Sequence, residues 1–146
     1  MNIISTQAHV RWDCTYHVVI IPKYRKKVLY DQVRQRAGEI IRDLAKQKQI
    51  EVIEGTAKPD HIHMVLRIPP RYSVASIIGF LKGKSAIRLH NEFSQKKSVT
   101  QKSFWARGYF VRTTGIDQEI VEEYVRRQDE DDKHNDHNPQ MDFNWN

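Results

Sequence analysis

The sequence of 146 residues has one cysteine and no long apolar run. Cys14 alone cannot form an internal disulfide, so we expect a reducing, cytoplasmic environment. No stretch approaches the roughly 20 apolar residues of a membrane-spanning helix. The first five residues lack the charged start and apolar stretch of a signal peptide. We therefore expect neither a disulfide-rich secreted domain nor a membrane protein.

Composition and charge indicate one basic folded domain. Hydrophobic residues make up 39% and aromatic residues 10% of the chain, which is enough for one core. The net charge is +6, but residues 129–146 hold six acids and one lysine, a net of −5, so residues 1–128 carry +11. A body this basic favours a polyanionic partner such as nucleic acid. We expect one domain over residues 1–128 and a flexible acidic tail over residues 129–146.

Alternation and turn residues predict four strands. Residues 12–21 are rich in β-branched and aromatic side chains and end at Pro22. Residues 50–56 form a second strand, in which Gly55 would mark a bulge. Residues 61–68 form the third strand, after the turn signal Pro59-Asp60. Residues 104–113 form the fourth.

Three segments have helical spacing. Asp31 would cap a helix over residues 31–49, and Ser73 would cap a second helix that carries Ile87 and Leu89 near its end. The last helix covers residues 117–128. The order β-α-β-β-α-β-α predicts an α+β fold of the ferredoxin-like or RRM-like type. In this fold, split βαβ units give an antiparallel sheet with helices on one face. The other face would be free for a site.

His61-Ile62-His63 is the first constellation with chemical meaning. Residues i and i+2 of a strand point to the same face, so both imidazoles leave the sheet together, while Ile62 points into the core. Met64 and Leu66 continue the Ile62 face. Two histidines on one face can bind a divalent metal. Alone, the pair is also compatible with two ordinary surface histidines.

Tyr124 and Gln128 form the second constellation. They are four residues apart in the last predicted helix, so they lie on one face, one turn apart. In isolation, such a tyrosine is more typical of a core position and such a glutamine of a solvated one.

Together these motifs resemble the HUH superfamily of single-strand DNA nucleases, in which U is a hydrophobic residue. The particular resemblance is to the single-tyrosine transposases of the smallest bacterial insertion sequences. It runs from Trp12 to about Gln128. The segments that carry it are residues 15–19 (TYHVV), 58–64 (KPDHIHM), 77–85 (IIGFLKGKS), 105–110 (WARGYF) and 123–125 (EYV).

The resemblance implies a role for each motif residue. His61 and His63 match the metal-binding pair, Gln128 matches the third ligand, and Tyr124 matches the nucleophile. The family cleaves single-stranded DNA near imperfect hairpins, leaving a 5′-phosphotyrosine and a free 3′-OH that later rejoins strands. The implied partners are hairpin DNA and a second copy of the chain, since these transposases are homodimers in which the tyrosine helix acts in trans. The implied cofactor is Mg²⁺ or Mn²⁺.

Further basic residues are candidates for DNA contact. One group is a basic run that contains an aromatic ring, suited to phosphate contact and base stacking; the other follows the second helix. They are Tyr24, Arg25, Lys26, Lys27, Lys82, Lys84 and Arg88. Each is equally compatible with a solvated charged surface. We interpret His9, His17 and His90 as structural, since none has a partner at ligand spacing.

Three alternatives remain open from the sequence. Another phosphodiester or zinc hydrolase could use the histidine pair without a covalent tyrosine. A non-catalytic module could bind single strands on the same kind of sheet. A domesticated relative that processes chromosomal repeats would share the transposase chemistry.

Overall fold

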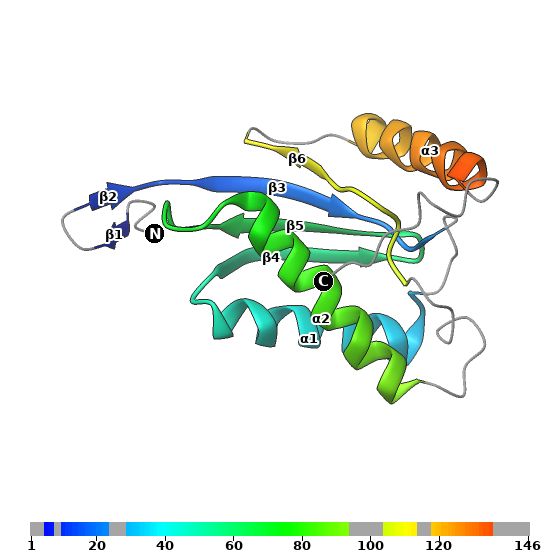
Figure 1. The fold of residues 1–146 in the computed structure, drawn as a ribbon, viewed down its shortest axis with the longest axis horizontal. Coiled ribbons are helices and arrows are strands. Elements are labelled where there is room, and N and C mark those ends of the chain that lie inside the picture. Colours follow the sequence, from blue (N-terminus) through cyan, green and yellow to red (C-terminus); the bar gives the residue numbers. More distant parts are fainter. Residues whose placement is uncertain (1–4, 8–9, 24–28, 94–103, 114–117, 136–146) are drawn as a thin grey trace.

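The computed structural model describes residues 5–7, 10–23, 29–93, 104–113 and 118–135 (Figure 1). The order of elements confirms the predicted β-α-β-β-α-β-α succession, preceded by a short hairpin of two strands. The elements are β1 (Ser5–Gln7), β2 (Val10–Trp12), β3 (Thr15–Ile20), α1 (Asp31–Gln47), β4 (Glu51–Lys58), β5 (His61–Arg67), α2 (Val74–Glu92), β6 (Phe110–Arg112) and α3 (Gln118–Asn135).

The central sheet has four strands in the order β4-β5-β3-β6. Each neighbouring pair is antiparallel. Strand β5 lies between β4 and β3, so the β3-α1-β4 unit is split, as the ferredoxin-like prediction requires. A bulge falls between Val52 and Glu54 and not at Gly55, where the sequence predicted it.

Helices α1 and α2 cover one face of the sheet (Figure 1). The main core lies between them and the sheet, and it includes Val18 and Ile20 of β3 together with Ile62 and Met64 of β5. Helix α2 begins as predicted, with the Ser73 side chain accepting a hydrogen bond from the Ser76 N–H.

Helix α1 begins differently from the prediction. The N-cap is Tyr30, which makes no side-chain cap, and Asp31 is the first helical residue, with a φ of 46°. The carboxylate of Asp31 still lies in the first turn, where an acid is favourable to the helix dipole.

The opposite face of the sheet is partly covered by α3 (Figure 1). Strand alternation sends Val19 and Ile21 to this side, where they form a second, smaller cluster with Ala106, Val121 and Val125. The sequence predicted that this face would be free for a site. Because α3 has its own apolar residues to bury, it lies on that face instead.

The predicted fourth strand is interrupted. Phe104, Trp105 and Ala106 are buried, but only Phe110–Arg112 forms the strand β6. The Ala106 N–H donates to the carbonyl of Ile21 at 2.7 Å. Gly108, with a φ of 80°, then takes the backbone out of the extended conformation.

Helix α3 continues seven residues beyond the predicted end at Gln128. It ends at Asn135, so residues 129–135 are helical and not the flexible tail that the acidic composition suggested. The Lys133–Asp129 pair, 3.2 Å apart, supports the added turns. Asp132 is 1% exposed. Residues 136–146 lie outside the described part of the chain.

Candidate functional site

Both predicted metal-binding histidines lie on the sheet face that carries α3. His63 is paired in register with Val19, and Val19 belongs to the cluster under α3. Ile62 is 4% exposed and points to the other face, as predicted. The Nε2 atom of His63 is buried and has no hydrogen-bond partner among the described residues. Burial is the main cause that lowers the His63 pKa, so its imidazole is neutral at neutral pH.

His61 is oriented by its neighbour in the chain. Its Nδ1 lies 2.9 Å from Oδ1 of Asp60. An imidazole whose Nδ1–H donates to a carboxylate keeps its Nε2 lone pair available as a ligand. A contact of this kind is common beside metal-binding histidines.

His17 is a site residue that the sequence did not identify. It was interpreted as structural, yet its ring lies on the same sheet face, with its centroid 5.6 Å from that of His63. The register explains this contact: Val19 lies opposite His63, and His17 is two residues away on the same face. Its Nδ1 is buried, again with no partner among the described residues. Only the pairing of β3 with β5 could reveal this proximity.

Tyr124 lies on α3 and belongs partly to the cluster that contains Val19. Its ring centroid is 5.6 Å from that of Phe110. Its hydroxyl is buried and makes no hydrogen bond within the described chain. Burial first, and then the nearby charges of Asp132 and Asp131, raise the pKa of Tyr124 above its ordinary value. The resting phenol is therefore protonated.

Gln128 is buried one turn after Tyr124, at 8% exposure. Its Nε2 donates to Oδ1 of Asp132 at 3.2 Å. Its Oε1 lies 4.0 Å from the position that a Cβ on Gly108 would occupy.

Two of the predicted DNA-contact residues have other partners. Lys82 is 0% exposed, so it cannot line a DNA surface; its Nζ donates to the carbonyls of Ala106 and Gly108. Helical spacing placed it beside Lys84 and Arg88, but the segment before β6 covers it. Lys84 is exposed, as a DNA contact requires.

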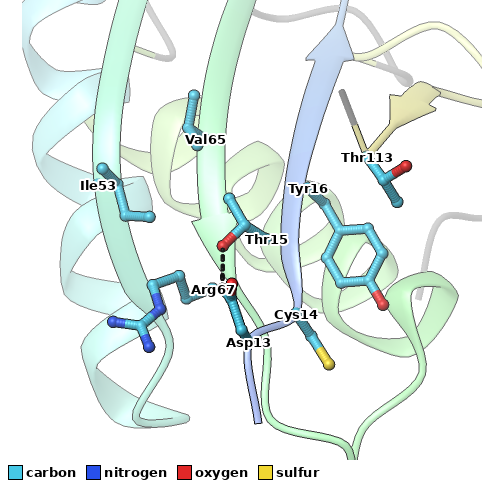
Figure 2. A pocket seen from close by; sticks show the side chains of 8 residues that line it. All are labelled: Asp13, Cys14, Thr15, Tyr16, Ile53, Val65, Arg67 and Thr113. Atoms are coloured by element: carbon cyan, nitrogen blue, oxygen red, sulfur yellow. Dashed lines mark hydrogen bonds between the residues drawn. The ribbon is translucent and has the colours of Figure 1, made fainter. Parts of the chain in front are cut away.

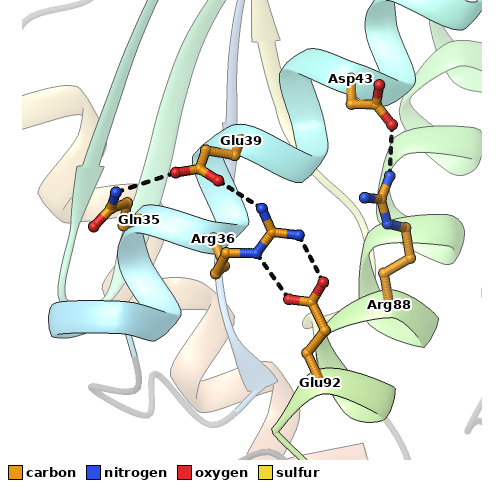
Figure 3. Close-up of polar contacts among 6 residues, drawn as sticks. All are labelled: Gln35, Arg36, Glu39, Asp43, Arg88 and Glu92. Carbon is orange, nitrogen blue, oxygen red and sulfur yellow. Dashed lines mark hydrogen bonds and ion pairs between the residues drawn. The ribbon is translucent and has the colours of Figure 1, made fainter.

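Arg88 is held by α1, as Figure 3 shows. Its Nη1 donates to Oδ2 of Asp43 at 2.7 Å, and that hydrogen bond lowers the Asp43 pKa. A second contact between α1 and α2 is made by the Arg36 guanidinium, which donates to both carboxylate oxygens of Glu92. The predicted contacts at Tyr24, Arg25, Lys26 and Lys27 lie outside the described residues.

The sheet face that bears the histidines continues into a hollow at the far end of β5 (Figure 2). Val65 and Arg67 follow His61 and His63 at alternate positions, and both line this hollow of about 490 Å³. The Arg67 guanidinium lies over the Trp12 ring and pairs with Glu51 at 3.1 Å. The histidine face thus continues along β5 to a buried cation beside an aromatic ring.

The donors fit a divalent cation. Two imidazoles and one amide are all neutral, which would leave the full charge of a metal available to an anionic substrate. Within the described ranges, no three His, Cys, Asp or Glu side chains are grouped to hold a metal. A cation at the histidine pair would therefore need a ligand of another type, such as the Gln128 oxygen.

Solved structures share this arrangement of sheet and helices. A candidate transposase from Deinococcus radiodurans superposes with a TM-score of 0.77 at 27% identity, over 85% of this chain and 97% of that one. A REP-associated tyrosine transposase bound to a REP hairpin gives a TM-score of 0.54 at 14% identity, over 82% of this chain and 68% of that one. The second likeness concerns the fold alone.

Sequence comparison identifies the family. The model of the family described as "Transposase IS200 like" matches residues 10–128, so the chain belongs to the IS200-like transposases. It is 42% identical over 127 residues to the transposase of insertion sequence IS200 from Salmonella typhimurium, covering 86% of this chain and 84% of the relative. It is 30% identical over 115 residues to the ISDra2 transposase TnpA of Deinococcus radiodurans, covering 77% and 82%.

The comparisons agree with the α+β prediction and with the predicted transposase class. No helix in the described ranges is both long and apolar enough to cross a membrane.

Proposed function

We propose that this transposase nicks and rejoins single-stranded DNA at hairpin-flanked ends through a 5′-phosphotyrosine on Tyr124. The observation that carries the proposal is a pair of buried polar groups. The Tyr124 hydroxyl and His63 Nε2 both lack a hydrogen-bond partner in the described chain. Tyr124 packs against the cluster that contains Val19, and Val19 is paired in register with His63. Buried polar atoms are normally satisfied. Two such atoms on the sheet face under α3 favour a site whose partner is substrate.

The proposed reaction conserves the phosphodiester bond energy. The Tyr124 oxygen bonds to the phosphorus of the scissile phosphate as its P–O3′ bond breaks. The tyrosine proton passes to an acceptor, and the 3′ oxygen leaves as a hydroxyl. Rejoining is the reverse reaction: a 3′-OH attacks the phosphotyrosine and releases Tyr124. No nucleotide cofactor is required.

His61, His63 and Gln128 would hold Mg²⁺ or Mn²⁺. Bound there, the cation would offset the negative charge that builds on the non-bridging phosphate oxygens. The chain supplies the orientation: the Asp60 contact sets the His61 ring, and burial keeps His63 neutral.

The proposed partner is single-stranded DNA next to a hairpin. The basic body, with +11 over residues 1–128, favours a polyanion. The structural neighbour that binds a REP hairpin has the same fold. Lys84 is exposed and remains a proposed contact, on the helix layer opposite the histidines. Tyr24, Arg25, Lys26 and Lys27 remain proposed contacts.

We further propose a homodimer in which the tyrosine helix of one subunit completes the histidine site of the other. In the single chain, α3 packs on its own sheet. The connector that would allow exchange contains Thr114 and Gly115, which lie outside the described residues. Exchange of an identical element needs no new contacts, because the same surfaces meet between subunits.

A covalent adduct on denaturing gels tests the proposed function. The protein is incubated with Mg²⁺ and single-stranded hairpin DNA from the flanks of its own gene. We expect a DNA–protein band that resists denaturation and weaker binding as salt rises. Binding without any adduct would favour the non-catalytic module instead. Equal cleavage of fully paired duplex would contradict the substrate.

A further inference from the structure

Two charged residues that the proposed chemistry does not use are buried, one on α2 and one on the tyrosine helix α3. Lys82 of α2 is 0% exposed and Asp132 of α3 is 1% exposed. Removing a charge from water is costly unless the charge is paired or hydrogen-bonded. The contacts of these two residues therefore have to account for their burial.

Lys82 connects α2 to the segment before β6. Its Nζ donates to the carbonyl of Ala106 at 2.7 Å and to that of Gly108 at 2.6 Å. Burial lowers the Lys82 pKa to about 7, while the charge of Asp132 acts in the opposite direction and favours the ammonium form. Lys82 thus holds the backbone beside Gly108 and attracts the acid on α3.

Asp132 in turn sets the direction of the Gln128 side chain. The amide Nε2 donates to Oδ1 of Asp132 at 3.2 Å, one helical turn away. An ionised carboxylate only accepts hydrogen bonds, so the nitrogen of the amide has to face it. The Oε1 atom is then directed elsewhere, to within 4.0 Å of a Cβ position on Gly108.

We propose that Asp132 is a positioning residue for the metal site. It turns the Gln128 carboxamide so that its oxygen is the atom presented to a divalent cation. An amide binds Mg²⁺ or Mn²⁺ through oxygen and not through its NH₂ group. This inference rests on the proposed role of Gln128 as third ligand. The family match ends at residue 128, so Asp132 lies beyond it.

The first test measures Mn²⁺ affinity on the full-length protein by the electron paramagnetic resonance signal of free Mn²⁺, without DNA. Asp132→Leu keeps the approximate shape but cannot accept the hydrogen bond. We expect its Kd for Mn²⁺ to rise about 10-fold, the usual lower range for losing an outer-shell partner. Asp132→Asn keeps an acceptor oxygen and should change Kd less. Asp131→Asn alters an exposed neighbour and should leave Kd unchanged.

A double-mutant cycle separates positioning from direct ligation. If Asp132 acts through Gln128, Asp132→Leu has no added effect in a Gln128→Ala protein. A further loss in the double variant would mean that Asp132 binds the cation itself, which overturns the proposal. An unchanged Kd in Asp132→Leu, with a raised Kd in Gln128→Ala, also overturns it but leaves the proposed function intact. An unchanged Kd in Gln128→Ala contradicts the ligand role of Gln128 itself.

The second test needs neither metal nor the Leu variant. The side-chain NH₂ protons of Gln128 should exchange slowly with water in the wild-type protein and in Asp131→Asn. They should exchange faster in Asp132→Ala, because the acceptor of the Gln128 Nε2–H hydrogen bond is lost. Fast exchange in the wild-type protein, or equal rates in Asp132→Ala and the wild type, would contradict this contact between Gln128 and Asp132.

Discussion

The imidazole rings of His17 and His63, from neighbouring strands, lie with centroids 5.6 Å apart on one face of the sheet. After burial, the charge of His17 is the largest cause that lowers the His63 pKa. We expect His17→Ala to raise the His63 pKa toward 6.5, because both the second cation and part of the burial are removed. Titration of the His63 ring by NMR on metal-free protein measures this. A His63 pKa that stays the same would mean that His17 does not influence it.

Tyr124→Phe should remove the covalent adduct and leave hairpin binding within about twofold. The variant keeps the ring that packs near Phe110 and loses only a hydroxyl that has no partner in the described residues. Its free energy of unfolding should therefore change little, or increase. Tyr72→Phe, on the other face of the sheet, is the matched control and should form adducts normally. Wild-type adduct levels in Tyr124→Phe would exclude this nucleophile.

Removal of either histidine should abolish cleavage but not binding. His61→Ala and His63→Ala each delete a proposed ligand, and EDTA should have the same effect on the wild-type protein. Gln128→Ala should be milder, since water can replace an amide oxygen. Gel assays over a series of Mn²⁺ concentrations compare cleavage by the wild-type protein with cleavage by the three variants. Full activity in EDTA would contradict the metal assignment.

Stability should rise with pH above neutrality because of Lys82. Its pKa is lowered from 10.5 to about 7 in the folded protein. Between these values the unfolded chain binds a proton that the folded protein has lost, so a rise in pH favours folding. From pH 7 to 9 the gain has an upper limit of roughly 2–3 kcal/mol, at 1.4 kcal/mol per pKa unit.

Lys82→Met should lack this pH-dependent gain, whatever its stability at pH 7. Lys84→Met, at an exposed position, should keep it. Chemical denaturation of the three proteins at pH 7 and pH 9 gives the comparison. Equal gains in Lys82→Met and the wild type would show that Lys82 is not the titrating group.

Mixed dimers test whether the site is built in trans. Tyr124→Phe and His63→Ala should each be inactive alone. Coexpressed, they should regain about one active site in each mixed dimer, because one intact tyrosine helix meets one intact histidine pair. Adduct formation by purified, differently tagged mixed dimers measures this. Mixed dimers that form but do not cleave would support sites built within one chain.

Local patterns were sufficient for much of the fold and for the proposed motif. The His61-Ile62-His63 alternation predicted two imidazoles on one face of the sheet with a core residue between them, and Ile62 is buried as expected. The Ser73 cap and the order of elements also followed from the sequence. These features depend on the spacing of residues within one strand or helix, which is visible without knowing its neighbours.

Features that depend on contact between elements required the tertiary structure. His17 meets His63 only because β3 pairs with β5 in one register. Lys82 and Asp132 are charged residues of the kind that usually lies on a solvated surface. Both are nevertheless buried, where α2, the segment before β6 and α3 come together. The spacing of apolar residues along each helix and strand specifies which of its sides is apolar. Whether a charged side chain is exposed or buried depends on what lies over it. For Lys82, the cost of burial is offset by the Ala106 and Gly108 carbonyls, which are distant in the sequence.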